Sequence, residues 1–119
     1  MVLTMEKIRD VNYYTFSMNK TGPESTKNVS QRLRYLQSAL ENVRGLNQAQ
    51  VAKEAKISKS AWNNALTGDN RISVNDAIKL LRTFGIELEW TYLGQGISRL
   101  PHDLAKEIDK LLAKDLSRQ

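Results

Sequence analysis

Five polar residues recur at helical spacing in the middle of the chain: Lys59, Ser60, Asn63, Asn64 and Thr67. At roughly 100° per residue they share one arc of a helix, here called the polar arc. The apolar residues between them share the opposite arc: Ala61, Trp62, Ala65 and Leu66. Amide, hydroxyl and ammonium groups can hydrogen-bond base edges in a major groove. The pattern therefore predicts a helix that is anchored in a core on one side and contacts nucleic acid on the other.

Two adjacent asparagines strengthen this interpretation, because asparagine is a poor helix former in mid-helix. An amide side chain can bind adenine through N6 and N7, so we expect Asn63 or Asn64 to contact DNA rather than only solvent. Lys59 has two open roles, since its ammonium can bind either guanine O6 and N7 or only a phosphate. Three arginines, Arg32, Arg34 and Arg44, are expected to be solvated charges.

Capping residues and apolar spacing predict the helices that position this arc. Asn47 with Gln50 forms a capping-box pattern at the second helix, Ser58 caps the third, and Gly68 ends it. Ser30 is expected to cap a first helix that runs to about Val43 and ends at Gly45, with a buried stripe of Leu33, Leu36, Leu40 and Val43.

Three further helices are expected after the polar arc. One begins at Ser73, has Asp76 in its first turn, and ends at Gly85. A short fifth helix covers 88–93 and is expected to place Trp90 and Leu93 in the core. A sixth begins near Pro101 and carries an apolar stripe of Leu100, Leu104, Ile108, Leu111 and Leu112.

The N-terminal part of the chain has a different pattern. Residues 11–18 are rich in β-formers, and Tyr14, Phe16 and Met18 alternate with polar residues, which is typical of a short strand. Residues 17–28 have the composition of a linker. We therefore divide the chain into an N-terminal arm and linker (1–28), a helical domain (29–94) and a C-terminal amphipathic helix with a possible dimerisation role (95–119).

The ordered set of caps, turn and helices in residues 29–94 resembles the phage repressor and Cro type of helix-turn-helix domain. Its features are the start of the second helix at 46–49, Val51-Ala52 within it, Ile57-Ser58 in the turn, Thr67-Gly68 after the third helix, and the entry to the fifth at 86–90. The resemblance implies an all-α, five-helix, lambda-repressor-like DNA-binding fold. Two positions depart from the family's pattern, because Lys56 stands where the turn usually has glycine and Trp62 where it usually has Ile, Val or Leu.

The resemblance also implies roles for individual residues. Gln48 matches a glutamine that contacts a phosphate and braces the DNA-reading helix. Lys59, Ser60 and Asn64 match base-reading positions, with Asn63 and Thr67 on the same arc nearer the DNA backbone. Asn70 and Arg71 match a loop that adds a phosphate or base contact.

Composition agrees with a nucleic-acid partner. The 119 residues have a formal net charge of +5. Residues 1–86 contain 13 Lys and Arg against 7 Asp and Glu, whereas residues 87–119 contain 5 against 6. A polyanion would therefore meet the front of the chain.

The same composition argues against other classes of protein. There is no cysteine and one histidine, His102, so we expect no catalytic, cofactor-binding or metal site. No apolar run approaches the roughly 20 residues of a membrane span, and no signal-peptide core is present. We therefore expect a cytoplasmic protein that does not enter a membrane.

These observations predict a sequence-specific, double-stranded DNA-binding transcriptional regulator. We favour a homodimeric repressor, because 119 residues leave little room for a separate effector domain. One alternative is the DNA-binding antitoxin of a toxin–antitoxin pair, with residues 1–28 or 95–119 as the toxin-binding segment. Another is a helix-turn-helix module that binds only proteins.

Overall fold

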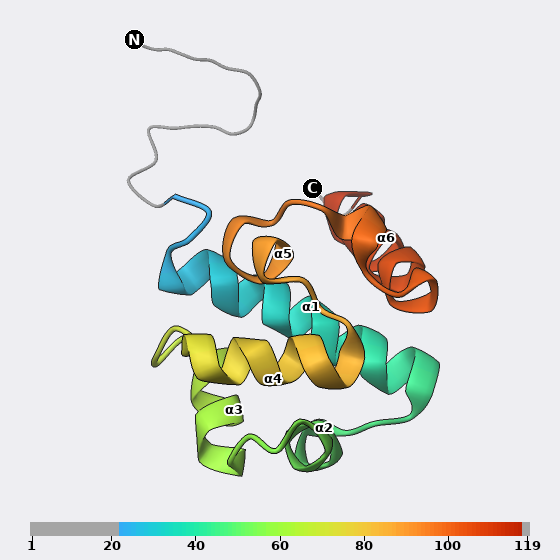
Figure 1. The fold of residues 1–119 in the computed structure, drawn as a ribbon. Coiled ribbons are helices and arrows are strands. Elements are labelled where there is room, and N and C mark those ends of the chain that lie inside the picture. Colours follow the sequence, from blue (N-terminus) through green and yellow to red (C-terminus); the bar gives the residue numbers. More distant parts are fainter. Residues whose placement is uncertain (1–21, 118–119) are drawn as a thin grey trace, which may run out of the picture.

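A computed structural model describes residues 22–117, which form an all-helical domain (Figure 1). The elements are α1 (Thr26–Arg44), α2 (Gln48–Ala55), α3 (Lys59–Thr67), α4 (Val74–Phe84), α5 (Leu88–Leu93), the 3-10 turn η2 (Ile97–Arg99) and α6 (His102–Ser117). The predicted fold class, five helices with an additional C-terminal helix, is confirmed. The strand expected within residues 11–18 lies outside the described residues.

The expected side-chain caps of α2, α3 and α4 are present. Asn47 and Gln50 form a reciprocal capping box, in which each side-chain oxygen accepts from the other's backbone N–H at 2.9 Å. Ser58 accepts from the third N–H of α3, and Ser73 does the same for α4. These local bonds fix the helix starts on either side of the polar arc.

The start predicted for the first helix is wrong. The helix begins at Thr26, and Ser25 caps it by accepting from the backbone N–H of Asn28 at 3.2 Å. Ser30, the expected cap, is buried inside the helix. The earlier start adds Val29 to the stripe of Leu33, Leu36 and Leu40, all fully buried, so hydrophobic burial favours it.

Two residues expected in the core are exposed instead. Val43 lies in the last turn of α1, which ends at Arg44, and its side chain is 40% exposed. Leu46, which follows the turn at Gly45, packs against the core instead of Val43. Leu93 is 42% exposed, since it is the last residue of a six-residue helix in which Trp90 takes the buried position. A short helix can direct only one narrow face inward.

The C-terminal helix packs along α1 of its own chain (Figure 1). Leu100, Leu104 and Ile108 from its stripe are buried there. Polar contacts follow the same seam: Arg44 donates twice to Asp103 (3.0 and 3.1 Å), Asn42 donates to Glu107 (3.0 Å), and Tyr35 donates to Asp115. Most of the stripe is thereby covered within the monomer, whereas Leu112 and Leu116 stay partly or largely exposed.

The turn after α2 contains a left-handed lysine. Lys56 has φ 62° and ψ 36°, and it is the single non-glycine residue with positive φ in the described part of the chain. A side chain in this conformation costs roughly 1–2 kcal/mol relative to right-handed backbone. Glycine removes that cost but gains freedom in the unfolded chain, which offsets part of the benefit.

Lys56→Gly should therefore raise the free energy of unfolding by up to about 1 kcal/mol. Thermal unfolding followed by circular dichroism measures this as a rise in Tm of several degrees. Gly45→Ala is the matched control, because Gly45 has φ 69° and an added Cβ would meet nothing within 4 Å. That variant should lower Tm through backbone strain alone. A lower Tm for Lys56→Gly would show that the lysine side chain stabilises the turn more than its backbone strains it.

Candidate nucleic-acid interface

The chain turns between α2 and α3 through a compact link. The backbone N–H of Ile57 donates to the carbonyl of Ala52 at 2.9 Å, across the left-handed Lys56. The Ile57 side chain is buried and so holds the link against the core. α3 then starts at Lys59 in a direction fixed by the turn and by the Ser58 cap.

α3 has the two faces that its sequence predicts. Trp62, Ala65 and Leu66 are buried, at 1–3% exposure. On the polar arc, Asn64 is half-buried and the other four members are exposed: Lys59, Ser60, Asn63 and Thr67. The exposed face of α3 is therefore built from hydrogen-bonding side chains and a cation.

A buried amide ties the anchor of α3 to the first helix. The Trp62 indole N–H donates to Gln37 Oε1 at 2.9 Å, and Gln37 Nε2 donates to the carbonyl of Leu46 at 3.1 Å. Gln37 itself is buried. One side chain thus satisfies the buried Trp62 N–H and a partly buried carbonyl, and it links α1, the α1–α2 connection and α3.

The far end of α3 is held by Arg34. Its guanidinium donates to the Leu66 carbonyl at 2.5 Å, at the negative end of the helix. The structure corrects the expectation that three arginines are solvated charges: Arg34 bonds α3, Arg44 pairs with Asp103, and Arg32 donates to the Thr91 carbonyl.

A hollow of about 390 Å³ separates the starts of α2 and α3. Three predicted site residues line it, Gln48, Lys59 and Asn63, together with Asn47, Ala49 and Trp62. The free backbone N–H groups at a helix start favour an anion, and the Lys59 ammonium adds positive charge. The hollow can therefore accept a phosphate next to the polar arc.

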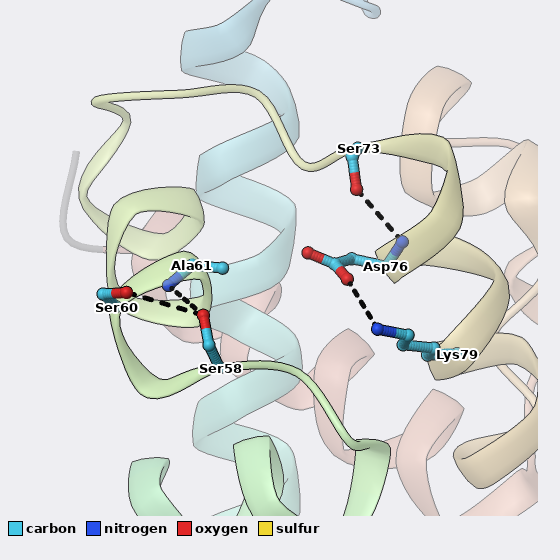
Figure 2. A network of polar contacts seen from close by, with 6 residues as sticks. All are labelled: Ser58, Ser60, Ala61, Ser73, Asp76 and Lys79. Atoms are coloured by element: carbon cyan, nitrogen blue, oxygen red, sulfur yellow. Dashed lines mark hydrogen bonds and ion pairs between the residues drawn. The ribbon is translucent and has the colours of Figure 1, made fainter.

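The starts of α3 and α4 have similar polar networks (Figure 2). At α3, Ser58 Oγ accepts from the Ala61 N–H at 3.1 Å and lies 3.5 Å from the Ser60 hydroxyl. At α4, the Asp76 carboxylate forms an ion pair with Lys79 at 3.4 Å, and the lysine compensates its negative charge. The Ser60 hydroxyl keeps only a long internal contact and can turn outward.

The remaining predicted site residues follow α3. Thr67 is exposed, although its hydroxyl donates to the Asn64 carbonyl at 3.3 Å. Asn70 is exposed, and its backbone N–H bonds the same carbonyl. Arg71 is exposed but donates to the Glu24 carbonyl at 2.9 Å, which ties it to the entry of α1 rather than to α3.

Gln37 and Arg34 are positioning residues that the sequence pattern did not reveal. Gln37 lies four residues after Leu33 and three before Leu40, and is therefore on the buried stripe of α1. A polar residue on such a stripe needs a buried partner, which is the signal that could have found it. Arg34 lies on an exposed part of the helix and gives no such signal.

Comparison with known proteins agrees with this geometry. Residues 38–91 match the family model described as Helix-turn-helix. This part of the chain is therefore similar to a helix-turn-helix domain. The match runs from the second half of α1 to α5, and it supports the family without singling out the phage repressors. No curated protein and no solved structure matches the chain.

Residues 22–117 contain neither a metal-binding cluster nor a membrane-spanning helix. No group of three or more His, Cys, Asp or Glu residues in this range could hold a metal ion. None of the described helices is long and apolar enough to cross a membrane.

The Gln37 bridge should contribute measurably to stability. Gln37→Leu leaves the buried Trp62 N–H and the partly buried Leu46 carbonyl without this partner, and we expect a loss of roughly 1–3 kcal/mol in urea unfolding. Gln31→Leu, at an exposed position of the same helix, should stay within about 0.5 kcal/mol of the parent.

A double-mutant cycle separates the bond from general packing. Because Trp62→Phe removes the N–H, the double variant should lose less than the sum of the single losses. Additive losses would show that the bond between the two side chains contributes nothing.

Proposed function

We propose that this protein is a sequence-specific, double-stranded DNA-binding transcriptional repressor that acts as a homodimer. The observation that carries the proposal is the division of α3 into a buried anchor at Trp62 and an exposed polar arc. A helix in this state can enter a major groove without unfolding any part of the domain.

Base reading is assigned to the polar arc. Asn64 and Asn63 each have a side-chain amide whose oxygen and nitrogen can bond adenine N6 and N7. Lys59, at the start of the helix, can bond guanine or a phosphate. Ser60 and Thr67 add hydroxyl contacts along the same arc. Their common face and exposure support this assignment.

Phosphate binding is assigned to the flanks of the same face. Gln48 lines the hollow beside Lys59, and its place at the first turn of α2 suits an anion. Asn70 and Arg71 extend the contact on the other side of α3. Two exposed lysines, Lys53 and Lys56, add positive charge to α2 and the turn.

Repression would then be steric. Two copies of α3, related by a two-fold axis, would enter successive major grooves about 34–36 Å apart and exclude polymerase from the site. Nothing beyond the bound protein is required for this mechanism.

DNA binding should be specific and strongly dependent on salt. After selection of a site from random duplexes, fluorescence anisotropy should give nanomolar-range affinity and a log–log salt slope of about −0.9 for each phosphate contacted. Equal affinity for every duplex would overturn sequence-specific recognition. Absence of binding to any duplex would favour a module that binds only proteins.

Asn64→Ala should weaken binding to the best site by roughly 1–3 kcal/mol and relax preference at one base pair. Gln48→Ala should weaken all sequences alike, because a phosphate contact carries no sequence information. Asn42→Ala is the matched control, since Asn42 lies against α6 at Glu107, and it should leave DNA affinity unchanged. Unchanged affinity in Asn64→Ala would show that this residue does not read a base.

The complex with the selected site should contain two chains. Analytical ultracentrifugation of the protein–DNA complex measures this directly. The site itself should show two half-sites centred about one helical turn apart. A complex with one chain per duplex would overturn the homodimer. Base reading by α3 would then still be tested by the DNA affinity of Asn64→Ala.

A further inference from the structure

An apolar groove of about 400 Å³ lies on the side of α1 opposite to α2 and α3. It is bounded by the first half of α1, by α5 with the loop that follows it, and by α6. Its apolar lining comes from Tyr35, Trp90, Ile97, Ile108 and Leu112. Leu112 is 37% exposed, which is high for a large apolar side chain that faces a groove.

The chain enters the described structure at the rim of this groove. Asn28 and Arg32 both line it, and both hold the segment that precedes α1. Asn28 Nδ2 donates to the Gly22 carbonyl at 2.9 Å, and Arg32 donates to the Pro23 carbonyl. The described part of the chain thus begins at the rim of the groove, at Gly22 and Pro23.

Arg32 supplies a buried donor at this rim. Its Nε donates to the Thr91 carbonyl at 3.1 Å. Burial lowers the pKa of Arg32 to about 10, against an opposite effect from Glu24. The groove therefore has a partly buried cation, Arg32, at its edge and apolar side chains along its lining. Such a surface suits a segment whose backbone carbonyls accept hydrogen bonds and whose side chains are apolar.

The sequence just before this point has matching chemistry. Residues 13–18 carry no charge, and Tyr14, Phe16 and Met18 alternate with Thr15 and Ser17. In extended backbone the first three side chains would share one face. Met18 precedes Gly22 by four residues, which can span up to about 14 Å, so the segment reaches the groove without crossing the domain.

We propose that the face formed by Tyr14, Phe16 and Met18 docks into this groove of the same chain. The tether favours this occupant over a separate molecule, because a short linker holds the segment at an effective concentration in the millimolar range. The volume also fits a few side chains rather than a partner's helix. Docking would cover Leu112 and leave the polar face of α3 free.

Cysteine cross-linking of the full chain tests this contact, since the native sequence contains no cysteine. Phe16→Cys is combined with Leu112→Cys, and the control combines Tyr13→Cys, on the opposite face, with Leu112→Cys. A disulfide requires Cα atoms within about 4.4–6.8 Å, so it reports close approach. Mild oxidation followed by intact mass and non-reducing electrophoresis should show an intrachain bond that forms about tenfold faster in the Phe16 pair, since docking by even one apolar side chain is worth about 1.4 kcal/mol.

The two tryptophans give a second readout that needs no new bond. Trp90 lines the groove, whereas Trp62 is buried in α3 on the other side of α1 and serves as an internal reference. Phe16→Ser should shift the indole N–H resonance of Trp90 and leave that of Trp62 unchanged. Tyr13→Ser should shift neither.

Each result decides the proposal. Equal cross-linking rates in the two pairs, or no effect of Phe16→Ser on Trp90, would overturn docking. An interchain disulfide would show that the groove takes the segment of a second copy, which overturns docking within one chain. DNA affinity of the cross-linked protein should equal that of its reduced form, so the outcome is independent of the function proposed above.

Discussion

A single buried amide, that of Gln37, links three parts of the structure. Gln37 accepts from the Trp62 indole and donates to the Leu46 carbonyl, so it links the central helix, the connection after it and the exposed helix α3. Trp62 is buried, and its indole N–H needs a hydrogen-bond partner there because an unpaired buried donor costs free energy. The bond acts together with the burial of Trp62, Ala65 and Leu66, which orients α3 so that its polar arc faces outward.

The two ends of α3 are constrained in different ways. At its start, the Ser58 cap and the left-handed Lys56 fix the direction in which the chain leaves α2. At its end, Arg34 satisfies a terminal carbonyl from α1. A helix of nine residues has little stability of its own, so these tertiary contacts supply the rigidity that groove recognition requires.

α1 separates two surfaces of different chemistry. On one side are the polar arc and the hollow between α2 and α3, where exposed lysines gather. On the other are α5, α6 and the apolar groove, where Arg44, Asn42 and Tyr35 bond acidic residues of α6. Acidic residues of α6 therefore take part in contacts within the chain, and one of them, Asp103, forms an ion pair with Arg44.

The sequence by itself determined where α2, α3 and α4 begin, at the caps Asn47, Ser58 and Ser73. It also determined the two faces of α3, because capping bonds and helical periodicity are local. It placed the start of α1 at Ser30 wrongly, since two serines could cap and only burial of Val29 favoured the earlier one. It also missed the roles of Gln37, Arg34 and Arg44, and it left open whether the apolar stripe of α6 packs on its own domain or on a second copy. These depend on contacts between residues far apart in sequence, and local patterns carry no information about which distant groups meet. Only the tertiary structure decided them.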